Sequence, residues 1–370
     1  MTSAADPRVE VFAVEPAAAQ LVVRAEHDGD NAVSVGTRSA LVSVHDGVGA
    51  VVLDGLDADT SYAVTINGRP ATTLRTLPAP PGQFLGRLAT VSDMHIGETG
   101  FGRAPRLHLS ADAATAHPVV CLRAALAELG AWGAESLVVK GDLTHDSRAA
   151  EYDLAGELLA ACGLPLWAIP GNHDGGNHRH DDGSVHLARH QIVLHEQTTG
   201  AELAGLQVVL ANTVHPGREH GFAPLDDAPL FELLGQGRPT LLVLHHQLMT
   251  TPFPYYLPPG IYGPAAKRLL DRIAATNPAT MVTTGHTHRH RRRRHGPVMI
   301  SEVGSTKDHP GTWAGYLVYE GGIVQTVRRI MDREALAWTE DTRRSALGAW
   351  GRWSPGRLTD RCFTHPWPSR

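Results

Sequence analysis

Five short polar clusters in this chain carry residue types that bind metal ions. They read Asp93-Met94-His95, Gly141-Asp142, Gly171-Asn172-His173-Asp174, Leu244-His245-His246 and Gly285-His286-Thr287-His288. Carboxylate and amide oxygens combined with imidazole nitrogens, without thiolates, suit Mn, Fe or Zn better than Ca or Cu(I). Two such ions about 3.5–4 Å apart can clamp a phosphoryl group and lower the pKa of a bound water. The residue types therefore point to a metal-binding site, and a two-metal centre for phosphoryl chemistry would need this mixture of ligands.

Each cluster follows an apolar segment that we expect to be a β-strand. From Arg87 such segments alternate with amphipathic stretches that predict helices at Val119 to Leu129, Ala149 to Ala161 and Ala265 to Ala275, which is an α/β pattern. In α/β folds ligands gather beyond the carboxyl ends of the strands, and the glycines in the clusters allow tight turns there. One polar strand end is weak evidence, but five predict a common site.

The first part of the chain has a different pattern. Short alternating strands are predicted between residues 8 and 77, with turns at Asp28-Gly29-Asp30 and Asn67-Gly68, which favours a small antiparallel sandwich. The stretch from Gly55 to Tyr62 resembles the fibronectin type III segment in which a tyrosine hydrogen-bonds back to the chain. A proline-rich linker follows at 77–82. We therefore predict a fibronectin III-like β-sandwich at 1–80, a catalytic domain at 81–330 and a C-terminal extension at 331–370.

The five clusters in this order resemble the motifs of the calcineurin-like metallophosphoesterases, and all are present between residue 87 and about residue 330. The resemblance implies an α/β catalytic domain built as a four-layer αββα sandwich, which would bind two divalent or trivalent metal ions. It implies that the first ion is held by Asp93, His95 and His288 and the second by Asn172, His245 and His286. Asp142 would bridge the two ions.

The same resemblance implies the roles of the remaining polar residues. His173 matches the histidine that donates to the phosphate and protonates the leaving oxygen after attack by a metal-bridging hydroxide, and Asp174 is a candidate for orienting it. His145, His246 and His290 are weaker candidates for contacting the ligands or the substrate. His246 directly follows a ligand histidine, so its role is open.

Two departures from related families guide the choice of substrate. Purple acid phosphatases also carry an N-terminal sandwich, but His95 and His145 stand where they have a glycine and an iron-binding tyrosine. The Asp-Met-His opening instead resembles class III cyclic-nucleotide phosphodiesterases and glycerophosphodiesterases, although Gln247-Leu248 replaces the Pro-Pro that many of those enzymes carry. We expect a phosphodiesterase acting on a small phosphoester substrate, with a phosphomonoesterase, a nuclease and a non-catalytic scaffold as alternatives.

Three further segments have more than one interpretation. The basic run Arg289 to His295 is either a hairpin strand beside the site or a nucleic-acid contact, and the net charge of -5 disfavours nucleic acid. Tyr255 and Tyr256 lie in a proline-stiffened loop that either packs on itself or lines the substrate pocket. The tryptophan-rich tail is expected to pack on the catalytic domain, to close one side of the site, or to form the interface of a homo-oligomer.

Composition limits the remaining classes of function. No apolar run approaches the ~20 residues of a membrane span, and the first residues do not resemble a signal peptide. The three cysteines are too few and too scattered for a disulfide framework. We therefore expect a cytoplasmic protein with no membrane partner. Of the 22 histidines, five are assigned as metal ligands or acid by the resemblance, and most of the others are expected on the surface.

Overall fold

Two antiparallel sheets form the N-terminal part of the chain in the computed structural model, which describes residues 6–102, 106–108, 112–175, 180–250 and 258–368. One sheet has the order β1-β2-β5 and the other β4-β3-β6-β7. The bounds are β1 Arg8–Val14, β2 Ala18–Arg24, β3 Gly29–Val35, β4 Arg38–Val44, β5 Val48–Asp54, β6 Ser61–Ile66 and β7 Arg69–Arg75. Buried valines and leucines from both sheets, such as Leu21, Val33 and Val64, form one shared core.

The turn predicted at Asp28-Gly29-Asp30 is wrong, because Gly29 and Asp30 begin β3, which the sequence reading missed. The strand buries Val33 and Val35 with Asn31, and a polar inward residue weakened its alternating pattern. The predicted tyrosine contact is present, since the backbone N–H of Asp57 donates to the Tyr62 hydroxyl at 2.8 Å. The fibronectin III-like relationship itself stays a prediction.

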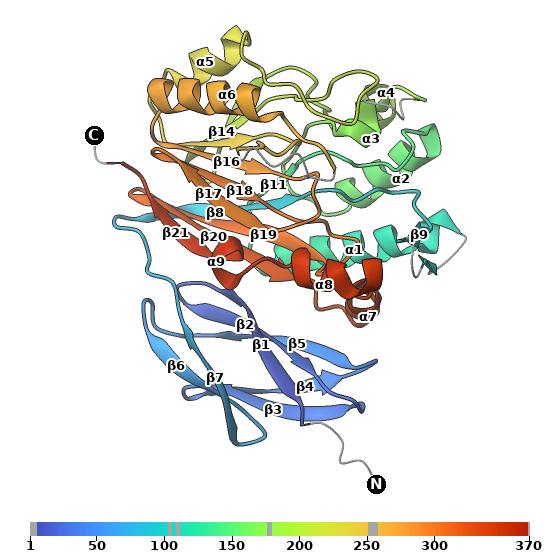
Figure 1. The fold of residues 1–370 in the computed structure, drawn as a ribbon, viewed down its shortest axis with the longest axis vertical. Helices are drawn as coiled ribbons and strands as arrows, with labels where there is room; N and C mark the ends of the chain where they lie inside the picture. Colours follow the sequence, from blue (N-terminus) through green and yellow to red (C-terminus); the bar gives the residue numbers. More distant parts are fainter. Residues whose placement is uncertain (1–5, 103–105, 109–111, 176–179, 251–257, 369–370) are drawn as a thin grey trace.

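Two six-stranded sheets form the part of the chain predicted to be catalytic, which is called the catalytic part below, and both combine parallel and antiparallel strand pairs (Figure 1). The first has the order β12-β11-β8-β19-β20-β21, with bounds β8 Phe84–Val91, β11 Ser136–Val139, β12 Leu166–Ala168, β19 Thr312–Tyr319, β20 Gly322–Arg329 and β21 Phe363–Pro366. The second has the order β13-β14-β15-β16-β18-β17, with bounds β13 Thr199–Leu203, β14 Leu206–Leu210, β15 Thr240–Val243, β16 Thr280–Thr284, β17 Arg291–His295 and β18 Val298–Glu302.

Helices cover the outer faces of the two sheets. Val138 and Tyr316 of the first sheet share a core with Val208 and Met281 of the second, so the sheets pack face to face. Helices α1 (His117–Ala131) and α2 (Ala149–Ala160) pack on the first sheet, and α5 (Ala228–Leu234) and α6 (Gly263–Thr276) pack on the second. The predicted four-layer αββα arrangement after an all-β region is therefore confirmed.

Shorter elements connect these layers. They are β9 Gly100–Phe101, β10 Leu107–His108, α3 Asn172–Gly175, α4 Gly183–Ala188 and the 3₁₀ turns Ala113–Thr115 and Ala346–Gly348. Among the described helices, none is both long and apolar enough to cross a bilayer.

The C-terminal segment contacts both the sandwich and the catalytic part (Figure 1). It contains α7 (Arg333–Thr342), α8 (Ala349–Trp353), α9 (Leu358–Arg361) and β21, which extends the first catalytic sheet beside β20. Leu336 and Cys362 reach into the core of the sandwich. The division into 1–80, 81–330 and 331–370 remains a prediction. The segment 331–370 packs against both of the other parts.

Candidate metal centre

All five polar clusters lie at the carboxyl ends of parallel strands. The first three follow β8, β11 and β12 of one sheet, and the last two follow β15 and β16 of the other. Because the two sheets pack face to face, these strand ends converge at one edge of the sandwich. The order of strands in each sheet therefore brings together residues that are up to 195 positions apart, from Asp93 to His288.

The backbone is strained where five of the predicted ligands sit. Asp93, His95, Asp142, His286 and His288 all have positive φ angles, between 48° and 70°. Non-glycine residues rarely adopt this conformation, which persists where the surrounding structure enforces it and which clusters at functional sites. The strain shows that the fold holds these side chains in particular directions.

Glycines of the clusters allow the loops to approach one another. A Cβ atom on Gly171 would lie 2.2 Å from Asp142 Oδ1, and one on Gly285 would lie 2.0 Å from Ser92 Oγ. Gly141 has a φ of +93°, and a Cβ there would meet His245 Nδ1 at 2.6 Å. Any side chain at these positions would push the predicted ligands apart.

Asp142 lies between the two predicted ligand groups. Its Oδ1 accepts a hydrogen bond from the backbone N–H of His173 at 2.9 Å, which fixes the carboxylate. Its Oδ2 stands 3.5 Å from His95 Nε2 and 3.4 Å from His245 Nε2. One oxygen thus faces a histidine of each group, which is the placement that a bridging ligand needs.

The first group brings Asp93, His95 and His288 together. His95 Nε2 and His288 Nε2 are 3.2 Å apart, and His288 Nε2 is 3.6 Å from Asp93 Oδ1. The Asp93 carboxylate also accepts the backbone N–H of His286 at 2.9 and 3.0 Å. Asp93 and His95 are buried, so their polar atoms face one another and not solvent.

The second group brings Asn172, His245 and His286 together. His245 Nε2 is 3.1 Å from Asn172 Oδ1, and the ring centroids of His245 and His286 are 5.1 Å apart. His245 Nδ1–H donates to the Lys140 carbonyl at 2.8 Å, which directs Nε2 toward Asp142. Burial opposes a charge on His245, but the Asp142 carboxylate outweighs it and raises the pKa of His245 to about 9.

These residues fit the two metal ions that the motifs imply. Ligand atoms bound at ~2.0–2.2 Å to one ion lie roughly 2.8–3.6 Å apart, because these are the edge lengths of an octahedron and a tetrahedron of this size. The distances of 3.2 to 3.6 Å within the first group and around Asp142 match that spacing. In two sets of three residues, the possible ligand atoms lie close enough together to hold an ion. These sets are Asp93 with His95 and His288, and Asp93 with Asp142 and His245.

His173 lies beside both groups and is partly exposed. Its ring packs edge-on against His95 with a centroid distance of 4.4 Å, and its Nδ1–H donates to the His145 carbonyl at 2.6 Å. Donation from Nδ1 leaves Nε2 as the atom that can hold or release a proton toward a substrate. This geometry agrees with the acid role predicted for His173, which remains to be tested.

Asp174 has a different set of partners from the one predicted. Its carboxylate accepts the backbone N–H groups of Leu143, Thr144 and Gly171 and the Thr144 hydroxyl, at 2.8 to 3.0 Å. Burial and the nearby Asp142 charge raise the pKa of Asp174 to about 6. The carboxylate joins the second and third loops, whereas the carbonyl of His145 is the hydrogen-bonding partner of His173 Nδ1. The orienting role of Asp174 toward His173 stays a prediction.

The three weaker candidates for contacting the ligands or the substrate are buried to different extents. They are His145, His246 and His290. His145 stacks on His173 with centroids 5.6 Å apart and is partly exposed at the site. His246 uses both ring nitrogens on protein partners, the Thr213 hydroxyl at 2.9 Å and the Glu219 carbonyl at 3.1 Å, so it supports the second group.

His290 has no exposed surface and accepts the backbone N–H of Gly304 at Nδ1. It cannot face a substrate in solvent, so the substrate contact considered for it is wrong. Tyr255 and Tyr256 lie outside the described residues, and their contribution to the pocket stays a prediction.

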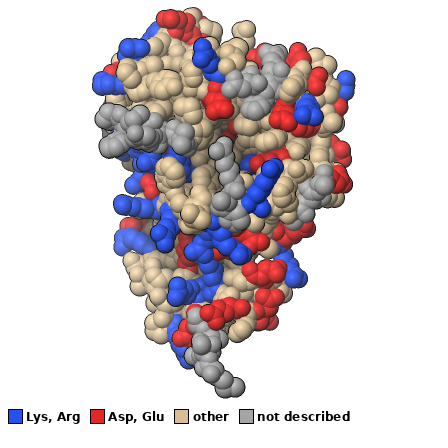
Figure 2. All heavy atoms as spheres, turned by 45° about the vertical axis from the view of Figure 1, so that its right-hand side comes forward, with Lys and Arg blue, Asp and Glu red and all other residues tan. Residues whose placement is uncertain are grey.

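The arginine run forms the edge strand β17, which pairs antiparallel with β18. Arg289 is buried, with its guanidinium carbon 4.1 Å from the centre of the Trp353 ring, and Arg293 is paired with Glu302. Arg292 and Arg294 are exposed. Basic and acidic side chains are interspersed on the face drawn in Figure 2.

Sequence reasoning missed Lys307 and Asp308, which lie against the first ligand group. Asp308 Oδ2 accepts from His288 Nδ1–H at 2.6 Å, and Lys307 Nζ is 3.4 Å from the same oxygen. Both residues lie a few positions beyond β18, so a polar strand end was again the available signal. No predicted histidine ligand lies in this segment, so the sequence analysis did not assign Lys307 and Asp308 to the site.

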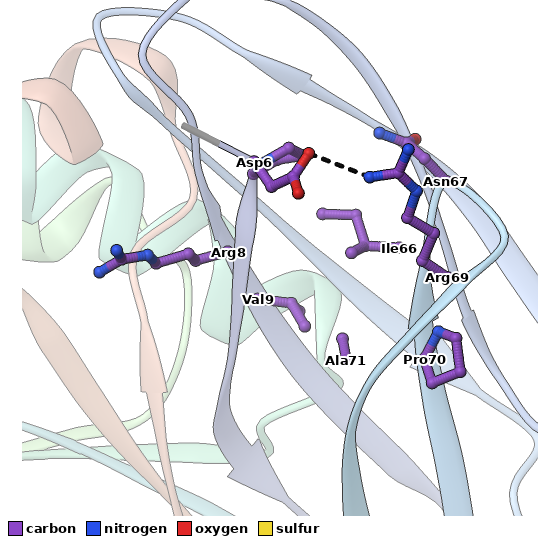
Figure 3. Close-up of a pocket in the computed structure, with 9 residues that line it drawn as sticks. Asp6, Arg8, Val9, Ile66, Asn67, Arg69, Pro70 and Ala71 are labelled. Carbon is purple, nitrogen blue, oxygen red and sulfur yellow. Dashed lines mark hydrogen bonds and ion pairs between the residues drawn. The ribbon is translucent and has the colours of Figure 1, made fainter. Parts of the chain in front are cut away.

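The N-terminal sandwich contains a hollow that is distant in sequence from these clusters. A cavity of about 560 Å³ opens between the start of β1 and the β6–β7 hairpin of the sandwich, where Asp6 and Arg69 form an ion pair of 3.1 Å (Figure 3). Both side chains of that pair are largely exposed. The described residues lining it contain no cluster of metal ligands, so chemistry is concentrated at the strand ends.

Comparison with known proteins agrees with this site. The family model for calcineurin-like phosphoesterases matches residues 86–290, more than half of the chain. The chain therefore belongs to the calcineurin-like phosphoesterase family, a class of phosphoester hydrolases. The family match includes all five clusters and ends before β17, β18 and the C-terminal segment.

Individual relatives are distant. A probable cyclic nucleotide phosphodiesterase of Vesicomyosocius okutanii is 25% identical over 162 residues, which are 43% of this chain and 60% of that protein. The purple acid phosphatase PPD1 of yellow lupin is 12% identical, with a TM-score of 0.47 over 89% of this chain and 72% of that one. The phosphopantetheinyl hydrolase of Mycobacterium tuberculosis is 16% identical, with a TM-score of 0.36 over 60% of this chain and 91% of that one.

Proposed function

We propose that this protein is a metal-dependent phosphodiesterase that hydrolyses small phosphodiesters of the cyclic-nucleotide or glycerophosphodiester type. The single observation that carries the proposal is the position of Asp142 Oδ2, which stands 3.5 and 3.4 Å from the facing nitrogens of His95 and His245. A carboxylate oxygen shared in this way supports two ions held side by side. The distant relationship to a probable cyclic nucleotide phosphodiesterase favours diesters over monoesters.

The side chains divide the work in the proposed reaction. Asp93, His95 and His288 would hold one ion, and Asn172, His245 and His286 would hold the other. Asp142 would contribute its carboxylate to both. When bound, the two ions polarise the phosphoryl oxygens and lower the pKa of a bound water. His173 holds a proton at Nε2 and transfers it to the leaving alkoxide oxygen, while its Nδ1–H stays on the His145 carbonyl.

The ligand set also bears on which metals are bound. Nitrogen and hard oxygen ligands without thiolates support Mn, Fe or Zn. The three cysteines are free, and burial raises the pKa of the Cys121 thiol, so that thiol is not poised to bind a metal. Free cysteines are also the basis for proposing a cytoplasmic location.

A substrate and metal screen tests the proposal. The metal-free protein is loaded separately with Mn²⁺, Fe²⁺ or Zn²⁺, and hydrolysis of a cyclic nucleotide, a glycerophosphodiester, a chromogenic phosphodiester and a chromogenic phosphomonoester is measured. We expect a higher kcat/KM for at least one small diester than for the monoester. A higher value for the monoester with every metal would instead assign a phosphomonoesterase, and no turnover with any metal would favour a scaffold.

A further inference from the structure

The C-terminal segment reaches the metal centre at Trp350, although it lies outside the stretch that matches the family. Trp350 is in α8 and is half-buried. Its indole Nε1–H donates to Asp308 Oδ1 at 3.2 Å, and its ring centroid is 6.4 Å from that of His288. A residue about 60 positions beyond the last cluster is thus adjacent to a predicted ligand.

Asp308 connects Trp350 to the ligand. Its other oxygen, Oδ2, accepts from His288 Nδ1–H at 2.6 Å. Fixing the proton on Nδ1 leaves the lone pair on Nε2, which faces Asp93 Oδ1 at 3.6 Å and His95 Nε2 at 3.2 Å. The two oxygens of Asp308 therefore link the indole of the tail to the ring of the ligand.

The surroundings keep Asp308 in place. Asp308 has no exposed surface, and its Oδ2 lies 2.6 Å from His288 Nδ1 and 3.4 Å from Lys307 Nζ. Lys307 is itself held by Glu98, with Nζ 2.6 Å from Oε2. The tail contributes a second contact here, because Trp338 Nε1–H donates to the Lys307 carbonyl at 2.8 Å.

We propose that Asp308 and Trp350 are positioning residues for the ligand His288, so that the C-terminal segment completes the metal centre. The inference rests on the proposed function, because it assumes that His288 binds an ion. Trp350 fixes the Asp308 carboxylate, Asp308 fixes the tautomer and direction of His288, and neither residue contacts the substrate in this role. Partners that orient a histidine ligand in this way typically change metal affinity by about 10–100-fold when they are replaced.

Metal affinity measured on the full-length protein tests the inference directly. The metal-free protein is titrated with Mn²⁺ by calorimetry and by competition with a chelator, for wild type, Trp350→Phe, Asp308→Asn and Trp353→Phe. Trp350→Phe removes the indole N–H but keeps a ring in place. Trp353→Phe is the matched control, because Trp353 is on the same helix, is exposed, and stacks on the Arg289 guanidinium.

We expect two equivalents of Mn²⁺ in the wild type. Trp350→Phe should weaken one of them about 10-fold and Asp308→Asn about 10–100-fold, with the other equivalent and the Trp353→Phe control unchanged within about 2-fold. Wild-type affinity at both sites in Trp350→Phe would overturn the inference and leave the proposed function standing. If Asp308→Asn does not fold, the result for Trp350→Phe alone tests the inference. A wild type that binds no Mn²⁺, Fe²⁺ or Zn²⁺ would overturn the proposed metal centre and this inference together.

Discussion

The N-terminal sandwich and the metal centre both contain residues with positive φ, but they use them differently. In the sandwich these residues include Asp46, Asp59 and Asn67, which lie in exposed turns. Asp and Asn adopt this conformation at little cost and are common turn residues. At the metal centre the conformation falls on three histidines and on the buried residues Asp93 and Asp142. There the residues are largely buried, and hydrogen bonds between loops, such as Asp93 N–H to the Gly141 carbonyl, hold the conformation in place.

The two regions also differ in the kind of side chain that they bury. The sandwich encloses mainly valine and leucine, whereas the centre encloses carboxylates and imidazoles that require partners. Substitutions in the sandwich should therefore change the free energy of unfolding and spare turnover. Substitutions at the centre should change turnover and have small or even favourable effects on stability, as is common where a site stores strain.

Asp142→Asn should have the largest effect on turnover. The neutral amide cannot compensate two cations, so we expect binding of the second ion to be lost and kcat/KM on the best diester to fall by at least ~10³-fold. Metal analysis and steady-state kinetics measure the two effects. If the variant retained both ions and full activity, the assignment of Asp142 as the bridging ligand would collapse.

His173→Asn should reduce turnover without loss of metal. Removal of a general acid typically costs ~10²–10⁴-fold, and the loss should be largest for diesters with poor leaving groups, which need the proton most. Kinetics across leaving groups of different pKa, with metal analysis of the same samples, would show this. An equal loss for good and poor leaving groups would contradict an acid role and indicate a purely electrostatic one.

Leu21→Ala should show the opposite behaviour. Leu21 is fully buried in the core of the sandwich, and the cavity created should cost ~2–5 kcal/mol of unfolding free energy. Chemical denaturation measures that loss, while kcat/KM and bound metal at 25 °C should stay at wild-type values. A parallel fall in metal content would mean that the sandwich shapes the centre and that the two regions are not independent.

Glu340→Gln should change the pH dependence of stability. Glu340 of α7 is paired with Arg24 of β2 at 2.7 Å and with Arg329 of β20 at 2.9 Å, so it joins the sandwich, the tail and the catalytic sheet. Burial opposes its charge, but the two guanidinium groups outweigh burial and lower the pKa of Glu340. A lowered folded pKa gives stability that is present above the unfolded value of ~4.3 and is lost as pH falls toward the folded value.

The variant should therefore unfold more easily at pH 7, by ~2–4 kcal/mol, because Arg329 is left buried without one of its partners. The difference from wild type should shrink as the pH falls below about 4. Thermal unfolding between pH 7 and pH 3 checks this, and a constant difference across that range would show that the charge of Glu340 is not responsible.

Replacing the exposed arginines of β17 should have the smallest effect. Arg292→Ala with Arg294→Ala should change diester turnover by less than about 2-fold, because neither side chain faces the clusters at the strand ends. Binding of single-stranded DNA should be weak in wild type and variant alike. A strong wild-type affinity that falls steeply with salt and is lost in the variant would revive the nuclease alternative.

The sequence predicted that the polar clusters lie at one edge of the sheets because strand ends in an α/β sheet have fixed relative positions. Each cluster directly follows a short apolar run, so its location follows from local pattern alone, and the family match confirms the region. The missed strand β3 shows the limit of such patterns. Asn31 is buried where the alternation calls for an apolar residue, and only packing between the two sheets reveals the strand.

Contacts around the ligands could not be predicted in the same way. That His145 supplies the carbonyl for His173, and that Asp174 binds three backbone N–H groups, depends on how two loops lie against each other. The link from Trp350 through Asp308 to His288 depends on a tail that folds back over the first sheet. Such contacts follow from tertiary packing and leave no spacing rule in the chain.

Titration of the metal-free wild-type protein with Mn²⁺, with hydrolysis of a chromogenic phosphodiester followed at each step, tests the central claim most directly. If Asp142 bridges two ions, turnover should stay low through the first equivalent, rise with the second, and then level off. Full turnover after one equivalent, or turnover that persists when all metal is removed by a chelator, would contradict a two-metal phosphodiesterase.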